Sequence, residues 1–232
     1  MSEAEKQFSF THAPSTLLIQ RSFVTVKLAR PLKQVFIAFS LALLSSCASI
    51  GTKFDSRNAA ALELRQLKSS EYLRLFGKPF STTTSTTADG KYEIVKYIYG
   101  FGDIGTARSR VLLMEFKEGV LNSYILGSSF DEDRTTVDPK RVEALKAETG
   151  KFSKEDVIAA MGRPHGKAFC PSLLPDYKDR CNKASEIWAW LTWDKVPTLG
   201  GGTMNGMTAY VLFNGDGKMV EVQTHENTRR RK

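Results

Sequence analysis

The sequence predicts an α+β fold of two tandem ααβββ units, each a three-stranded antiparallel sheet with its two helices packed on one face. The first observation behind this prediction is a repeated end to a short helical stretch. It reads Gly-Lys-Pro at residues 77–79 and Gly-Arg-Pro at residues 162–164. Because glycine followed shortly by proline is a common stop signal of a helix, both stretches are expected to end there. Such internal similarity indicates two copies of one unit.

The second observation is a pair of aromatic strands, YEIVKYIYG from residue 92 and EIWAWLTW from residue 186, each after a polar loop. A further strand follows each aromatic strand, and a turn at Gly119 or Gly217 joins it to a last strand. The segment Asn214-Gly215-Asp216-Gly217 is the stronger hairpin signal, because asparagine and glycine tolerate positive φ. Each unit is therefore expected to end in a three-stranded meander.

Two helices are expected ahead of the strands in each unit. Asp138 and Pro139 are typical of an N-cap followed by proline at the first helical position. Ser153 and Asp156 resemble a capping box in which Asp replaces the usual Glu. In the first unit, residues 58–67 fill the position of the first helix.

The boundaries of the predicted parts follow from these elements. The first unit covers residues 57–126, a polar linker covers 127–136, and the second unit covers 137–223. A short basic tail, 224–232, follows the second unit. Chance similarity between short helices and strands is the alternative to a true repeat.

Two charged segments need an interpretation. The linker contains the acidic cluster Asp131-Glu132-Asp133, whose spacing does not fit an EF-hand calcium loop and favours a solvated turn. The run Arg229-Arg230-Arg231-Lys232 is expected to be a solvated, disordered tail, with contact to anionic lipid headgroups or an envelope polyanion as the alternative. Neither segment predicts a metal or nucleic-acid site.

Composition limits the class of protein. The chain has 232 residues, of which 41% are hydrophobic and 25% charged, with a formal net charge of +8. These values are typical of a globular protein and argue against a wholly disordered chain or a polytopic membrane protein. Only three cysteines occur, so the chain is no disulfide-rich miniature scaffold.

An export signal precedes the predicted units. Lys27, Arg30 and Lys33 come before an apolar run, residues 35–44, that is too short for a comfortable transmembrane helix. A basic flank, a short apolar middle and an exit of small residues are the three parts of a secretory signal peptide. Residues 1–46 are therefore assigned to a leader with a signal peptide.

The exit of this run, Leu44-Ser45-Ser46-Cys47, resembles a bacterial lipoprotein signal. The resemblance implies diacylglyceryl attachment to the Cys47 sulfur, cleavage before Cys47 and acylation of the new amino group. Residues 47–56 would then be a lipidated tether, and Ala48 after the cysteine favours transfer to the outer membrane. The alternatives are a buried helix with an ordinary thiol and an uncleaved anchor.

The first 26 residues fit poorly in front of such a signal, because a basic region usually opens the chain. No methionine lies between Met1 and the apolar run. We therefore expect translation to begin nearer Val24, Val26 or Leu28, from a non-AUG codon.

The remaining cysteines, Cys170 and Cys181, lie in the segment CPSLLPDYKDRC. Outside the cytoplasm a spare pair of cysteines is usually bridged, so a disulfide is predicted. A metal site is the alternative, but no histidine or third cysteine lies at ligand spacing.

The aromatic strands supply the candidate partner-binding residues. Tyr97, Tyr99, Trp188 and Trp190 share one face by period-2 alternation, and aromatic side chains are frequent anchors at interfaces. The alternative is that these rings belong to the core. Both interpretations stay open on the sequence alone.

Signatures of an enzyme are absent from the sequence, so no catalytic residue and no cofactor other than the covalent lipid are expected. His12 and His225 lie in the leader and the tail, and His165 lies in a loop with no nucleophile motif to serve. The glycine-rich stretch 199–206 lacks the Lys-Ser/Thr of a phosphate loop.

The short helix that ends in Gly-basic-Pro, the aromatic strand and the Val-x-Phe strand with its glycine hairpin together resemble the SmpA/OmlA lipoprotein family, which includes BamE-like subunits. The tandem also resembles β-lactamase inhibitory protein. The resemblance covers residues 57–126 and 137–223 and implies a lipid-anchored, periplasm-facing outer-membrane protein. It implies a non-enzymatic scaffold or accessory subunit in outer-membrane β-barrel assembly or envelope integrity. The alternative is a binding or inhibitory module that clamps an enzyme or ligand on its joined sheet surface.

Overall fold

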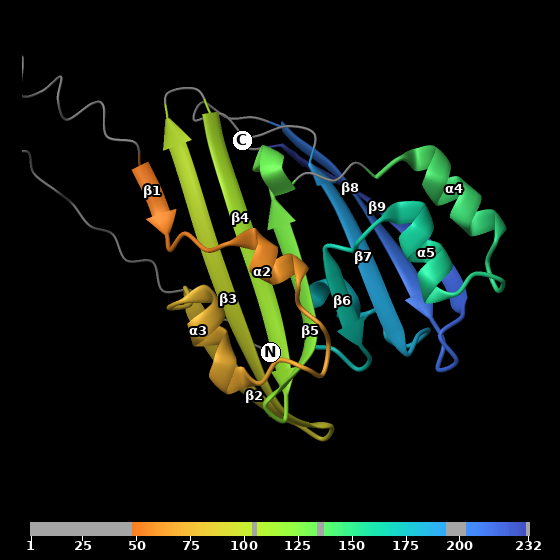
Figure 1. The fold of residues 1–232 in the computed structure, drawn as a ribbon, viewed down its shortest axis with the longest axis horizontal. Coiled ribbons are helices and arrows are strands. Elements are labelled where there is room, and N and C mark those ends of the chain that lie inside the picture. The colour runs from red at the N-terminus through yellow and green to blue at the C-terminus, as the bar shows by residue number, and fades with distance from the viewer. Residues whose placement is uncertain (1–47, 104–105, 134–136, 194–202, 231–232) are drawn as a thin grey trace, which may run out of the picture. The chain divides into compact units, whose positions relative to one another are not determined.

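A computed structural model describes residues 48–103, 106–133, 137–193 and 203–230 of the chain (Figure 1). The predicted leader with its signal peptide, and Cys47, lie outside these residues. No helix in the described ranges is long and apolar enough to cross a membrane.

The described chain is dominated by one antiparallel sheet of nine strands. The strands are β1 (Ala48–Gly51), β2 (Ser81–Thr87), β3 (Gly90–Asp103), β4 (Thr106–Lys117), β5 (Val120–Ser128), β6 (Gly166–Phe169), β7 (Glu186–Trp193), β8 (Thr203–Phe213) and β9 (Met219–Arg230). Their order is β1-β3-β4-β5-β6-β7-β8-β9, and β2 pairs with β3 on the same side as β1. One edge of the sheet is therefore shared by β1 and β2, and the other edge is β9.

The prediction of two ααβββ units with separate three-stranded sheets is wrong. The short strand β6 pairs with β5 on one side and with β7 on the other, and so joins both halves into one sheet (Figure 1). The physical reason is that β5 and β7 would otherwise present unpaired backbone groups at an edge. The residues of β2 and β6 lie in the predicted polar loops, and those of β1 lie in the predicted lipidated tether, 47–56.

Helices are few and short. They are α2 (Ser56–Ala60), η1 (Ser69–Glu71), α3 (Tyr72–Phe76), η2 (Asp131–Asp133), α4 (Pro139–Ala147), α5 (Lys154–Met161) and α6 (Pro175–Lys178). The first-unit helix expected at residues 58–67 is reduced to α2, which ends at Ala60. Figure 1 shows α2, α3, α4 and α5 on the same face of the sheet.

The predicted helix caps are confirmed. Asp138 accepts a hydrogen bond from the Lys140 backbone N–H at the start of α4. At the start of α5, Ser153 and Asp156 form the capping box. The helix stops are also confirmed, because α3 and α5 end at Gly77 and Gly162, which have φ values of +74° and +75°.

Two hydrophobic clusters fill the space between the helices and the sheet. The first lies beneath α2 and α3, and the second beneath α4 and α5. The first contains Phe54, Ala59, Leu62, Tyr72, Phe76, Val95, Tyr97, Leu112, Met114, Phe116, Leu121, Tyr124 and Leu126. The second contains Val137, Val142, Leu145, Val157, Trp188, Trp190, Ala209, Val211, Phe213, Met219 and Val222.

The opposite face of the sheet carries a third cluster. Because side chains alternate along a strand, Ile187 and Ala189 point away from the helices that cover Trp188 and Trp190. Leu174 and Tyr177, from the segment around α6, pack on this second face. The sheet is thus covered on both sides where its two halves meet.

Strand β9 continues through residues 224–230, in register with β8 up to the pair Thr203 and Arg230. The expectation of a disordered tail over these residues is therefore wrong. The reason is that β8 begins early, at Thr203, and supplies backbone partners. Residues 231–232 lie outside the described part of the chain.

Candidate functional site

The aromatic residues predicted to bind a partner lie in the core. Tyr97 and Trp190 are 1% exposed and Trp188 is 4% exposed. Tyr99 is half-buried, and its ring stacks on Phe130 with 5.6 Å between the centroids. The prediction of a binding surface is therefore wrong for Tyr97, Trp188 and Trp190, because the helices cover that face of the sheet.

Two of these rings have a structural role that links the aromatic strands to the Gly-basic-Pro motifs. The Tyr97 hydroxyl donates a hydrogen bond to the Gly77 carbonyl over 2.7 Å. The Trp190 indole N–H donates to the Gly162 carbonyl over 3.2 Å. In each half the aromatic strand thus satisfies a backbone acceptor at the end of a helix.

The predicted disulfide between Cys170 and Cys181 is confirmed. It closes the segment that covers the second face of the sheet, with 5.2 Å between the two Cα atoms. Inside this segment the Tyr177 hydroxyl donates to the Tyr124 carbonyl over 2.9 Å. Burial raises the pKa of Tyr177 well above its ordinary value, so the hydroxyl remains a donor.

A buried carboxylate, Glu115 of β4, holds the start of the same segment. It is 0% exposed and accepts a hydrogen bond from the Leu173 backbone N–H over 2.6 Å. Asn122 and the hydroxyls of Ser123 and Ser172 also donate to it. A glutamate inside the apolar run VLLMEF was the signal for this site, and the sequence analysis passed over it.

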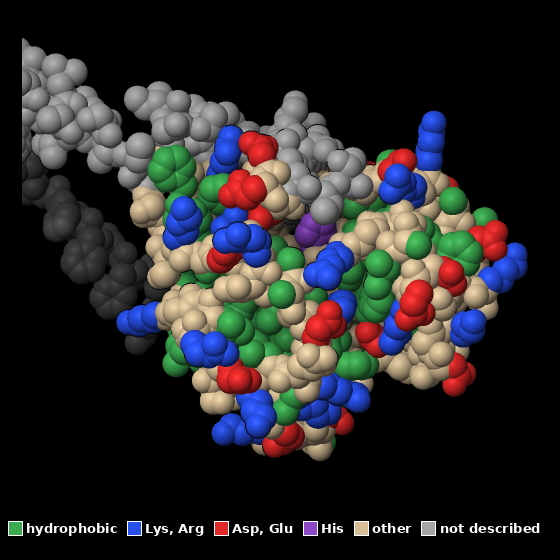
Figure 2. All heavy atoms as spheres, in the orientation of Figure 1, with side chains coloured by type: hydrophobic (Ala, Val, Ile, Leu, Met, Phe, Trp, Pro, Cys, Tyr) green, Lys and Arg blue, Asp and Glu red, His purple; other side chains and the backbone are tan. Residues whose placement is uncertain are grey.

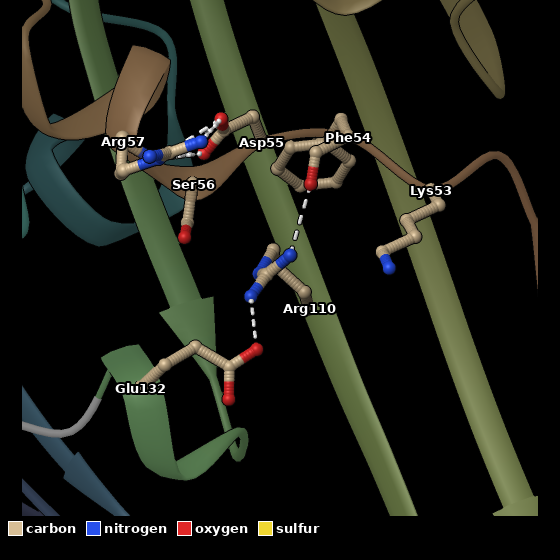
Figure 3. A pocket seen from close by; sticks show the side chains of 7 residues that line it. All are labelled: Lys53, Phe54, Asp55, Ser56, Arg57, Arg110 and Glu132. Carbon is tan, nitrogen blue, oxygen red and sulfur yellow. Dashed lines mark hydrogen bonds and ion pairs between the residues drawn. The ribbon is translucent and has the colours of Figure 1, made fainter.

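A pocket with a charged lining surrounds Arg110, which projects from the middle of β4. Its volume is about 590 Å³, and Figure 3 shows the side chains that line it. They are Lys53, Phe54, Asp55, Ser56, Arg57, Arg110 and Glu132. The connector between β1 and α2 therefore forms one wall of this pocket, and β4 with η2 forms the other.

Arg110 links three segments that are far apart in the sequence. One Nη donates to the Phe54 carbonyl over 2.9 Å, and the other Nη donates to Glu132 over 3.1 Å (Figure 3). Nε donates to Asp133 over 2.7 Å. The guanidinium also lies over the Phe130 ring, 4.8 Å from its centroid. Such a set of donors fixes the N-terminal connector against the sheet.

The acidic cluster of the linker is explained by this arrangement. Asp131 pairs with Arg108 over 3.0 Å, while Glu132 and Asp133 pair with Arg110. The side chain of Asp133 is 4% exposed. The expectation of a solvated turn is therefore wrong for Asp133, because a buried arginine on β4 requires a counter-charge.

A second pocket of about 430 Å³ continues from the first along β3 and β4. It shares Lys53, Arg110 and Glu132 with the first pocket. The aromatic rings of Tyr99, Phe101 and Phe130 and the side chain of Arg108 complete its lining. Together the two form an open groove with an apolar floor and a charged rim, next to the first strand.

The chemistry of this groove is dominated by arginine–carboxylate pairs. Arg57 bonds Asp55 at the exposed rim and lowers the pKa of that carboxyl to about 2. The carboxylates and guanidinium groups of the groove are bonded mainly to one another. Among the described residues, no group of three or more metal-ligating side chains comes together.

His165, the loop histidine of the sequence analysis, is partly buried beside this groove. Its Nδ1 accepts a hydrogen bond from the Leu191 backbone N–H over 3.0 Å. Desolvation lowers the pKa of the imidazole, and Asp133 opposes this change. The ring therefore acts as a neutral acceptor that ties the loop after α5 to β7.

Charges of both signs are interspersed on the helix-covered face in Figure 2. No family model, no curated protein and no solved structure matches the chain.

Proposed function

We propose that the chain is a lipid-anchored, periplasm-facing protein of the outer membrane that acts as a non-enzymatic scaffold or accessory subunit. The process that it serves is the assembly of outer-membrane β-barrels or the maintenance of the envelope. The observation that carries the proposal is the signal before Cys47, with its basic flank, short apolar run and small-residue exit. Strand β1 begins at Ala48, so cleavage before Cys47 would leave every described residue in the mature protein.

A scaffold role is further supported by the hydrogen bonds that the buried charged side chains form within the protein. The buried charged groups Arg110 and Glu115 each bond to several segments of the chain itself. Groups committed to such bonds stabilise the structure and are not available to transfer protons to a substrate. The BamE-like resemblance of the sequence motifs supports the same role.

The lipid anchor is tested by growing cells that express the tagged full chain with an alkyne-bearing fatty acid. Labelled protein is then captured and its N-terminal peptide is analysed by mass spectrometry. We expect a modified peptide that begins at Cys47 and the loss of label in Cys47→Ala. An unprocessed chain that carries no lipid would overturn the proposal.

The partner is tested by crosslinking in cells, followed by purification from membranes, with Cys47→Ala as the control. Recovery of β-barrel assembly subunits from the wild type alone supports the scaffold role. Recovery of a single periplasmic enzyme from both proteins would instead support the second candidate.

That second candidate is a binding or inhibitory module that clamps a periplasmic enzyme. It is favoured by the edge strand β2, whose residues Ser81–Thr87 are all serine or threonine and nearly all exposed. An edge strand without charge or proline is a template for an added strand. Thr84→Lys on this edge would weaken such a complex and leave an anchor-dependent complex elsewhere intact.

A further inference from the structure

We infer that the end of the sheet at which β1 begins and β3 ends rests directly on the lipid surface, with Ile50 and Phe101 in contact with the bilayer. This inference rests on the proposed lipid anchor at Cys47. It adds an orientation and a contact surface that the anchor alone does not determine.

The first argument is the absence of a linker between the anchor and the sheet. Ala48 pairs with Gly102, and the pairing continues to Gly51 and Tyr99. Consecutive Cα atoms are about 3.8 Å apart, so a lipid on Cys47 would hold this end of the sheet at the membrane surface. Within the lipidated tether predicted at 47–56, residues 48–51 belong to the sheet as β1.

The second argument is the apolar surface at this end. Ile50 is 65% exposed and Phe101 is 36% exposed. Ser49 pairs with Phe101 and Ile50 pairs with Gly100, so the two apolar side chains lie at one level on opposite faces of the sheet. Burial of such surface in lipid is favourable, and an anchored chain needs more than one hydrophobic contact to fix its orientation.

The third argument is that two acidic groups near this end are paired with arginines. Asp131 pairs with Arg108, and Glu132 pairs with Arg110. Lys53 follows β1 by two residues and lines the same groove. The repulsion of these two carboxylates from anionic headgroups is therefore reduced.

The test uses the lipidated full chain in vesicles of phosphatidylethanolamine and phosphatidylglycerol. An environment-sensitive fluorophore is attached to a single new cysteine, Ile50→Cys or Phe101→Cys. The matched controls are Phe80→Cys and Leu73→Cys, which replace apolar residues that are 58% and 53% exposed away from β1. A nitroxide carried by the lipid chains quenches fluorophores that reach the bilayer.

We expect blue-shifted emission and several-fold stronger quenching at positions 50 and 101 than at positions 80 and 73. Equal quenching at all four positions, with the protein retained on the vesicles, would overturn the inference while leaving the anchor intact. A chain that is never lipidated would overturn both the inference and the proposed function. Far-ultraviolet circular dichroism of each variant verifies that the sheet is preserved.

Discussion

The Tyr97 hydroxyl bonds the carbonyl of Gly77, and the Trp190 indole bonds the carbonyl of Gly162 in the same way in the other half of the sheet. Each bond joins an aromatic strand to the glycine that ends a short helix. The two sequence patterns that indicated a repeat are therefore parts of one structural device. It is used twice within a single sheet.

The first prediction concerns this bond. Tyr97→Phe removes the donor and leaves the Gly77 carbonyl without that partner, so we expect a loss of about 0.5–1.5 kcal/mol in the free energy of unfolding. Tyr97→Ala also creates a cavity and is expected to cost about 3–5 kcal/mol. Urea denaturation followed by circular dichroism measures both values. Tyr99→Phe is the control, because its ring contact with Phe130 is kept, and a Tyr97→Phe variant as stable as the wild type would contradict the argument.

The second prediction concerns Arg110. Arg110→Met keeps much of the side-chain volume but leaves the carboxylate of Asp133, whose side chain is 4% exposed, without its cation. Breaking a buried pair in this way is expected to cost about 3–5 kcal/mol. Arg57→Met removes the exposed pair with Asp55 and is expected to cost less than about 1 kcal/mol. Similar losses in the two variants, measured by urea denaturation, would show that the network is not the link between β4 and the N-terminal connector.

Local signals explain which parts of the fold were predictable. The caps at Asp138 and Ser153, the stops at Gly77 and Gly162 and the hairpin before β9 each depend on a few neighbouring residues. Strand β2 was not predicted, because both of its faces are exposed and its sequence has no alternation of apolar and polar residues. Strand β6 has only four residues, and its pairing with β5 and β7 is a long-range property.

Most of the candidate site could not be predicted from the sequence, for a related reason. A charged residue inside an apolar strand, such as Arg110 or Glu115, was the one signal that the sequence offered. Asp133, the partner of Arg110, lies 23 residues further along the chain, and Leu173, the partner of Glu115, lies 58 residues further along. These pairs follow from the topology of the sheet and not from local sequence. The aromatic rings were misassigned as a surface because alternation identifies a face of a strand and not what covers that face.

The third prediction concerns Gly166 at the junction of the two halves. A methyl group there would lie 2.2 Å from the Tyr177 hydroxyl oxygen and 2.7 Å from the Tyr124 carbonyl oxygen. Gly166→Ala is therefore expected to break the bond between these groups and to cost about 1–3 kcal/mol or more through overpacking. Gly215→Ala is the control, since its nearest neighbour would be Ser185 Oγ at 3.8 Å. Thermal unfolding of both variants measures the effect, and a melting temperature unchanged by Gly166→Ala would contradict the packing described at this strand.

The last prediction is a pH dependence that arises from His165. Desolvation lowers the pKa of the imidazole in the folded protein below the ordinary value of 6.5. The unfolded chain therefore binds a proton in a range where the folded chain does not, so the free energy of unfolding should fall as the pH falls below about 6.5. Above that pH both states hold the neutral ring, and His165 contributes no pH dependence.

The effect of His165 is isolated by urea denaturation at several values between about pH 5 and pH 7.5, the range in which histidine titrates. In His165→Asn an amide oxygen takes the place of Nδ1 as the acceptor for the Leu191 N–H, so the fold is retained while the titrating group is lost. We expect a shallower loss of stability in acid for this variant than for the wild type. His225→Asn, at an exposed position of β9, is the matched control for the loss of an imidazole. If His165→Asn keeps the wild-type slope, the buried imidazole is not the group responsible, because its protonation is the step that the substitution removes.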